Sequence, residues 1–205
     1  MRQPSQSRSQ KTLDRIVQAA GTCLEGTAWK DVTIQDICRA APASVGSFYA
    51  RFPDKTALLD YLDETYTEAF LDMVATLEGE LAQAADLEAA LSRLVFRVQD
   101  FYAARRGVAR AVIHRARGGD EGAAARTARM NAELGRVIAA FGRFRSEFSE
   151  PDWATALGDA LAIAFHAIRE PVLNPQSTGR EVPMETARAL NVRMLWLHLT
   201  QPVRD

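Results

Sequence analysis

The sequence predicts an all-α fold, with a small N-terminal helical domain followed by a larger helical body. Apolar residues recur at spacings of three and four in nearly every segment. Proline and glycine separate these segments, and none shows the sustained two-residue alternation of a strand bounded by hairpin turns. The 205 residues are 47% hydrophobic and 25% charged, which is ordinary for a globular protein and argues against disorder.

The first predicted helix carries one apolar stripe and ends near Gly26. Its stripe residues stand at i, i+3, i+4, i+7 and i+11: Leu13, Ile16, Val17, Ala20 and Leu24. A second helix is predicted from Thr33, because Thr33 and Asp36 match a capping box, in which each residue caps the other. This helix must stop by Ala41, since Pro42 disfavours helical geometry in the residue before it.

A third, short helix is predicted from Ser44 to Phe52, after a tight turn. Phe48 and Phe52 are four residues apart and can pack this helix onto the first two. Pro53 and Asp54 then break the chain, and Asp54 can cap a long helix that begins at Lys55. We therefore expect one domain over residues 1–55 and a second over residues 56–205.

The body continues in the same helical style. Apolar residues keep helical spacing over 87–101 and over 130–148, with a glycine-rich break at 118–122 between them. A further helix is predicted to begin with Ser149 as its cap and Pro151 in its first turn. A loop over Pro171–Pro183 and a last helix over Met184–Thr200 follow.

The charge is unevenly distributed along the chain. Residues 1–55 hold 8 Lys and Arg against 5 Asp and Glu, whereas the remainder holds 17 against 21. The modest excess of positive charge in residues 1–55, followed by an acidic remainder, predicts that only the N-terminal part binds a polyanion.

Several functional classes are disfavoured. Cys23 and Cys38 lack the spacing of a zinc site or a disulfide framework, which favours a reducing cytoplasm. The three histidines, His114, His166 and His198, are scattered, so we expect no metal and no cofactor. No nucleophile–base pair or phosphate loop suggests an enzyme. Neither a signal peptide nor a membrane span is predicted, so we expect a soluble, cytoplasmic protein without membrane contact.

The second and third predicted helices have the outline of a helix-turn-helix unit. If Phe48 and Phe52 face the core, then Ser44, Val45, Ser47 and Tyr49 face elsewhere. Small side chains would let the backbone of this helix approach a DNA edge closely, and Tyr49 suits a phosphate at the groove wall. A phosphate contact is also predicted for Lys55.

The segment TLDRIVQAAGTCLEGTAWKDVTIQDICRAAPASVGSFYARFPDKTALL, residues 12–59, resembles the N-terminal DNA-binding domain of the TetR family of transcriptional regulators. The resemblance rests on the aliphatic first helix, Gly26 and Trp29, Thr33, and the string from Gly46 to Lys55. It implies core positions for Phe48 and Phe52. It also implies DNA contacts by Thr33 to phosphate, by Gln35, Val45 and Gly46 to bases, and by Ser47, Tyr49, Arg51 and Lys55 to the backbone.

Two features depart from the pattern of the family. Glycine usually stands where this chain has Pro42, and proline holds φ near −65°, so the turn is expected to follow another path. The run from Ser44 to Ser47 also contains no Arg, Asn or Gln for bidentate base reading. We therefore expect Val45 to meet a thymine methyl, Gln35 to read an adenine, and DNA shape to supply much of the specificity.

The resemblance implies that the body provides dimerisation and a ligand pocket. The helix from Trp153 to Ile168 and the last helix are apolar on more than one face, and such helices need covering on both sides. The predicted dimer interface is Trp153, Leu157, Leu161, Ala164, Ile168, Leu190, Met194 and Leu197. The candidate pocket residues are Phe101, Tyr102, His114, Met130, Phe141, Phe144, Phe165 and His166, although aromatic stripes at this spacing are often simply core.

The leading interpretation is a homodimeric repressor that binds double-stranded DNA at a palindromic operator and responds to an unidentified small-molecule effector. One alternative is an architectural DNA-binding protein on the same scaffold, whose body contacts a protein. An all-α enzyme is the other alternative, and the sequence offers it no catalytic constellation.

Overall fold

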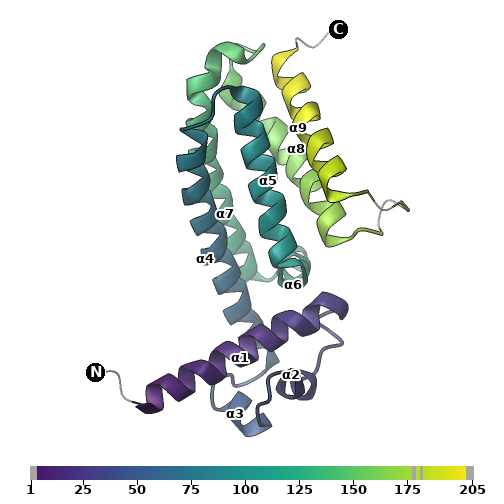
Figure 1. Cartoon of the computed structure of the whole chain (residues 1–205). Coiled ribbons are helices and arrows are strands. Elements are labelled where there is room, and N and C mark those ends of the chain that lie inside the picture. Colours follow the sequence, from purple (N-terminus) through teal and green to yellow (C-terminus); the bar gives the residue numbers. More distant parts are fainter. Residues whose placement is uncertain (1–3, 177–178, 181, 202–205) are drawn as a thin grey trace. The chain divides into compact units, whose positions relative to one another are not determined.

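The computed structural model of the chain describes residues 4–176, 179–180 and 182–201, and in these residues it contains helices and no strand. In order, they are α1 (Pro4–Gly26), α2 (Ile34–Ala40), α3 (Val45–Tyr49), α4 (Lys55–Leu81), α5 (Leu87–Ala104), α6 (Arg106–Arg117), α7 (Glu121–Ala140), the 3₁₀ helix η1 (Phe141–Glu147), α8 (Trp153–Leu173) and α9 (Met184–Thr200) (Figure 1). The predicted all-α fold is confirmed.

The chain forms two compact units, and the N-terminal one is larger than a segment ending at residue 55. It takes in the chain up to Thr67 together with Arg105–Arg126, so it includes α6. Ion pairs bind this second segment to α4: Arg115 lies 2.6 Å from Asp60, and Arg126 lies 2.7 Å from the buried Asp63. The second unit holds Glu68–Ala104 and the chain from Thr127 onward.

The start of α2 follows the predicted capping box. The Thr33 hydroxyl accepts from the Asp36 amide at 3.1 Å, and the Asp36 carboxylate accepts from the Thr33 amide at 3.1 Å. The hydrogen bonds from Thr33 hold the pKa of Asp36 below its usual range. The helix ends with Ala41 as its C-cap, as the proline that follows requires.

Three predicted boundaries are wrong. Helix α3 ends at Tyr49, because Pro53 disfavours helical geometry at the preceding Phe52 and residues 50–52 tighten into a turn. Ser149 does not cap α8; its amide and hydroxyl donate to the carbonyl of Leu199, and Asp152 is the cap. Helix α8 also continues through Pro171 to Leu173, where Val172 and Leu173 are buried and offset the missing N–H donor of proline.

The expected path of the turn at Pro42 is also wrong. We expected a route with negative φ, yet Pro42 has φ of 28°, the kind of conformation that glycine takes without cost. The pyrrolidine ring favours φ near −65°, so this turn is strained. Ala43 closes the turn by donating its amide to the Cys38 carbonyl at 3.0 Å.

The core of the second unit is built around α5. The apolar stripe predicted for this helix is buried throughout: Leu87, Leu91, Leu94, Val95, Val98 and Phe101. Helix α9 lies against both α5 and α8 (Figure 1). Among the described residues, no helix combines the length and hydropathy needed to cross a bilayer.

Candidate nucleic-acid interface

The short helix α3 is held to the N-terminal unit by aromatic packing. Phe48 and Phe52 are buried, as predicted, with their ring centroids 5.6 Å apart. Tyr49 sets its ring edge-on to Phe48 at 5.6 Å, and it stays 53% exposed. The aromatic residues on the inner side therefore fix which face of α3 meets the surroundings.

The outer face of α2 and α3 is small and exposed. The exposed residues include six of the predicted DNA contacts: Thr33, Gln35, Ser44, Val45, Gly46 and Tyr49. A seventh, Ser47, is half-buried, and its amide donates to the Ser44 hydroxyl at 3.1 Å, which caps the helix. Val45 is 39% exposed although it is β-branched and apolar, so folding within this chain does not account for its presence here.

Gly46 lies at the middle of this face. A β-carbon built on Gly46 would meet only the Ser44 hydroxyl oxygen, at 3.9 Å, which is ordinary contact. The backbone has no positive φ at this position that would require glycine. The chain itself therefore has room for a larger residue, and the glycine leaves space for something outside the chain.

Arg51 and Lys55 are engaged with the protein itself, a role that the sequence did not reveal. The Lys55 ammonium donates to the carbonyls of Trp29 and Val32 at 2.8 Å each, and it lies 4.7 Å from the centroid of the Trp29 ring. The Arg51 guanidinium donates to the Ser47 carbonyl at 2.7 Å and to the Ser9 carbonyl at 3.1 Å. Both cations bind segments of this unit to one another, and two of the three ammonium protons of Lys55 are already used.

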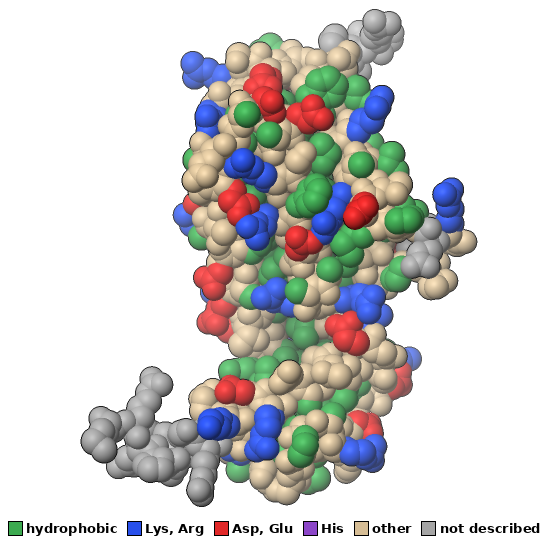
Figure 2. All heavy atoms as spheres, viewed as in Figure 1, with side chains coloured by type: hydrophobic (Ala, Val, Ile, Leu, Met, Phe, Trp, Pro, Cys, Tyr) green, Lys and Arg blue, Asp and Glu red, His purple; other side chains and the backbone are tan. Residues whose placement is uncertain are grey.

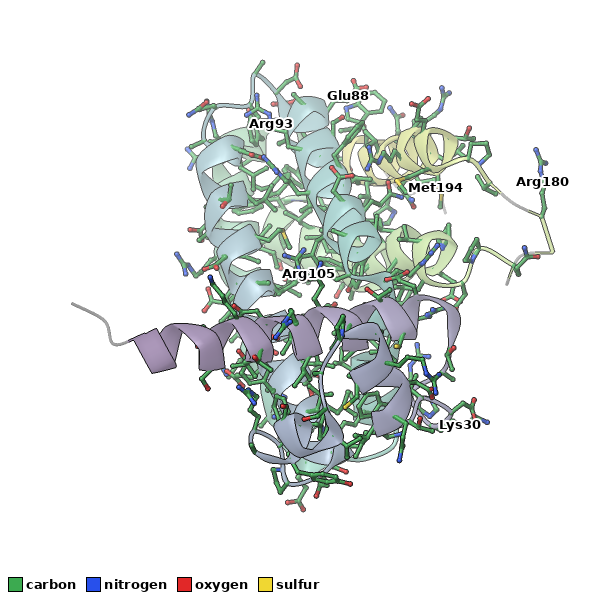
Figure 3. The ribbon with its side chains drawn as sticks, turned by 60° about the horizontal axis from the view of Figure 1, so that its bottom comes forward. Lys30, Glu88, Arg93, Arg105, Arg180 and Met194 are labelled. Carbon is green, nitrogen blue, oxygen red and sulfur yellow. The ribbon has the colours of Figure 1, made fainter. Side chains whose placement is uncertain are left out.

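The sequence interpretation also missed the exposed cations along α1 and the segment that follows it, Lys11, Arg15 and Lys30. Lys30 points outward from the segment between α1 and α2 (Figure 3). Their signal was present only as the excess of positive charge in residues 1–55. Because they are exposed and long, they can reach phosphates that the small face of α3 does not touch.

The predicted pocket residues do not gather at one cavity mouth. Four of them, Phe101, Tyr102, Phe141 and Phe144, are buried core residues. His114 and His166 are exposed, and Met130 and Phe165 are half-buried. His114 also belongs to the N-terminal unit, whereas the other seven belong to the second.

A groove of about 670 Å³ lies between α5 and α9 instead, and none of the eight predicted pocket residues lines it. Its apolar wall includes Phe96, Val192 and Trp196. Arg188 lies 4.5 Å from the ring centroid of Phe96, and its guanidinium pairs with Asp100 and with Gln99. Figure 2 shows apolar side chains between basic and acidic ones over these two helices.

The residues predicted for the dimer interface differ in their burial within the chain. The four α8 residues Leu157, Leu161, Ala164 and Ile168 are buried within the chain, so they cannot cover a partner. The sequence could not separate the faces of α8, because this helix is apolar on more than one of them. Trp153 is half-buried, with its ring centroid 5.7 Å from that of Phe148.

The three α9 residues of that prediction are exposed: Leu190 by 52%, Met194 by 62% and Leu197 by 39%. Met194 is labelled on α9 in Figure 3. On α8 the exposed large apolar residue is Ile163, at 76%, which the sequence interpretation did not select. These four residues, Ile163, Leu190, Met194 and Leu197, are called the α8–α9 outer face below.

The N-terminal part of the chain is similar in sequence to a known family. The model of the bacterial regulatory proteins of the tetR family matches residues 16–62. No curated protein matches the sequence of the chain.

Solved structures match nearly the whole chain at low identity. FadR from Bacillus subtilis, a transcriptional regulator solved in complex with stearoyl-CoA, is 13% identical with a TM-score of 0.67, over 93% of this chain and 100% of FadR. PfmR from Thermus thermophilus, a TetR family transcriptional regulator, is 15% identical with a TM-score of 0.63, over 93% of this chain and 100% of PfmR. A TetR family regulator from Marinobacter aquaeolei is 18% identical with a TM-score of 0.61, over 95% of this chain and 98% of that one. These likenesses establish the fold over nearly the whole chain.

Proposed function

We propose that this chain, whose residues 16–62 match the model of the bacterial regulatory proteins of the tetR family, is a homodimeric repressor released from a palindromic operator by a small molecule. The observation that carries this proposal is the exposed outer face of α2 and α3. That face joins an exposed valine and tyrosine to a glycine for which packing within the chain has no need. Such a surface suits the close approach of a helix backbone to a base-pair edge.

Base reading falls to Gln35 and Val45. Gln35 is exposed near the start of α2, and its amide can pair with the N6 and N7 atoms of an adenine. Val45 offers an apolar surface to a thymine methyl. Because the face carries so few donors, we expect the deformability of the operator to supply much of the discrimination.

Phosphate contacts come from Thr33, Ser44, Ser47 and Tyr49 on this face. We assign a further share to the exposed cations Lys11, Arg15 and Lys30, which carry positive charge into the surroundings of the duplex. Arg51 and Lys55 then act through the protein, because their polar atoms already hold the carbonyls of Ser9, Trp29 and Val32. Lys55 has one N–H left for a phosphate.

Selection of bound duplexes from a random DNA library tests the proposed operator. We expect an inverted repeat whose half-sites are separated by about 10 base pairs or a multiple of that, as two recognition helices of a dimer require. Gln35→Ala and Val45→Ala are each expected to relax the preference at one position per half-site. Gln83→Ala, at an exposed residue of the turn that follows α4, is the matched control and should select the wild-type sequence. Selection of no sequence, or an unchanged preference in both α2–α3 variants, would reject direct reading by these residues.

We assign the dimer contact to the α8–α9 outer face. Its four large apolar side chains are exposed in the isolated chain, and three of them, Leu190, Met194 and Leu197, stand at i, i+4 and i+7 on one side of α9. A continuous exposed apolar strip of this kind favours a partner surface. A two-fold axis would place this face against its own copy and form an interface of four helices.

The effector is proposed to bind the helical body. FadR from Bacillus subtilis was solved with stearoyl-CoA, and it shares the fold of this chain. In this chain the groove between α5 and α9 has a volume typical of small-molecule sites, with aromatic walls and charged side chains at its edge. A ligand there would alter DNA affinity only if it favoured one arrangement of the dimer over another.

The protein is proposed to act without catalysing a reaction, in the cytoplasm where DNA is accessible. The alternative, an architectural DNA-binding protein with a protein partner on its body, predicts binding with little dependence on DNA sequence. The duplex selection described above separates the two functions.

A further inference from the structure

The end of α1 and the beginning of α6 meet backbone to backbone within the N-terminal unit. A β-carbon built on Gly107 would lie 2.6 Å from the carbonyl carbon of Leu24 and 2.7 Å from its oxygen. These distances are far inside ordinary contact, and the obstacle is backbone that cannot turn away. Glycine at position 107 therefore permits an approach that any side chain would prevent.

Neither of these helix ends is served by a charged or capping side chain at the expected position of its own helix. Helix α1 has no basic residue in its last turn, and the N-cap of α6, Arg105, makes no side-chain capping bond. The first N–H groups and last carbonyls of a helix nevertheless need partners.

The missing caps are exchanged between the two helices. The Glu25 carboxylate at the end of α1 accepts from the Gly107 amide at 2.9 Å and from the Arg106 Nε at 3.1 Å. In return, Arg110 of α6 donates to the carbonyls of Leu24 and Glu25 at 2.8 and 2.7 Å. Each side chain also carries the charge that the dipole of the helix it caps favours. We call this pair of exchanged caps the α1–α6 joint.

Helix α1 in turn supports the DNA-facing elements. Helix α1 buries Ile16, Ala20 and Leu24 and packs against α2. Arg51, just after α3, donates to the carbonyl of Ser9 of α1. The last turn of α1 also leads into the segment whose carbonyls, those of Trp29 and Val32, hold Lys55. A change at the end of α1 therefore alters the supports of both α2 and α3.

We propose that Glu25 and Arg110 are positioning residues for DNA binding, which hold α1 at the angle that presents α2 and α3 to a duplex. This inference rests on the proposed DNA-binding function. It assigns a structural role in the N-terminal unit to α6, although α6 follows the DNA-binding segment by a long stretch of sequence.

The test compares Glu25→Ala, Arg110→Ala and the conservative Glu25→Gln with the wild-type full chain. Amide hydrogen exchange of the last turn of α1 is measured without DNA, and affinity for the selected duplex is measured well below the unfolding temperature. Arg97→Ala is the matched control, because it removes an exposed Arg–Glu ion pair in the other unit.

We expect Glu25→Ala and Arg110→Ala each to speed exchange in this turn and to weaken duplex binding about fivefold to tenfold, the equivalent of one lost cap. Glu25→Gln, which keeps an acceptor for the Gly107 amide, should retain most of the affinity, and Arg97→Ala should match the wild type.

Faster exchange with unchanged affinity would show a merely structural joint and overturn the positioning role, as would unchanged exchange in both alanine variants. If the wild type itself bound no duplex, the proposed function would fail, whereas the exchange rates would still decide whether the joint exists.

Discussion

Gly46 and Pro42, in the segment of α2 and α3, are both residues that the local backbone conformation does not favour. Alanine would suit a helix better than Gly46, and the surrounding atoms leave space for it. Glycine would suit the turn better than Pro42, whose φ is 28°. The structure adds that Gly46 leaves room outside the chain and that Pro42 stands in a strained turn, and neither property can be read from the sequence.

Gly46→Ala is expected to stabilise the free protein and weaken DNA binding. Alanine in a helix is favoured over glycine by about 0.5–1 kcal/mol, whereas the added methyl occupies the space reserved for the duplex. Urea unfolding should show the gain, and duplex affinity should fall about tenfold. Gly79→Ala in α4, where a β-carbon would meet nothing within 4 Å, is the matched control and should stabilise without affecting affinity. Equal affinity of wild type and Gly46→Ala would contradict the close approach.

Pro42→Gly is expected to raise the free energy of unfolding by about 1 kcal/mol or more, because the strain of a proline at positive φ exceeds the entropic cost of a glycine. Urea unfolding monitored by circular dichroism measures the change. Pro53→Gly, at a proline without positive φ, is the comparison and should destabilise. Destabilisation by Pro42→Gly as well would mean that the turn follows a path with negative φ.

At the scale of elements, the sequence predicted features that depend on residues close together in the chain. It missed contacts between residues that are far apart in the chain. The capping box of α2 and the apolar stripe of α5 are local patterns, and both were confirmed. The partners of Lys55 are carbonyls more than 20 residues away, and carbonyls carry no sequence signal. The buried face of α8 could not be identified either, because alanine and leucine occur on several faces of that helix.

The capping box predicts a pH dependence of stability. Because the folded state holds the pKa of Asp36 below its unfolded value near 3.9, Asp36 stabilises the fold above about pH 4. This contribution is lost as the pH falls through the lowered folded pKa. Asp36→Asn should therefore unfold more readily than the wild type at pH 7, with the difference shrinking below pH 4. Thermal unfolding of both proteins across this range measures it, and a difference that is independent of pH would contradict it.

At the scale of the whole molecule, the fold was predictable because every level of the sequence agreed on helices, whereas the partner surfaces were not. The exposed position of Ile163 and the buried position of Leu157 follow from how α8 packs on α5 and α9, which periodicity alone does not give. In the proposed function, assembly links the body to DNA, since a palindromic operator would need two copies of α3.

Met194→Glu is expected to convert the proposed dimer into a monomer and to weaken binding to the proposed operator strongly, because it places a charge at the most exposed residue of α9 in the α8–α9 outer face. Sedimentation velocity at micromolar concentration measures the assembly. Leu157→Ala, in the buried face of α8, should lower stability by about 2–5 kcal/mol and leave a dimer. A wild-type monomer, or a dimeric Met194→Glu variant, would show that this face is not the interface.

The most direct test of the central claim is a gel shift with the DNA immediately upstream of the protein's own gene, at two salt concentrations. We expect a discrete complex that scrambled DNA of the same length does not compete away, with affinity falling steeply as salt rises because phosphate contacts release counterions. Equal binding to both DNAs would contradict selective regulation, and no binding at low salt would contradict the proposed function itself.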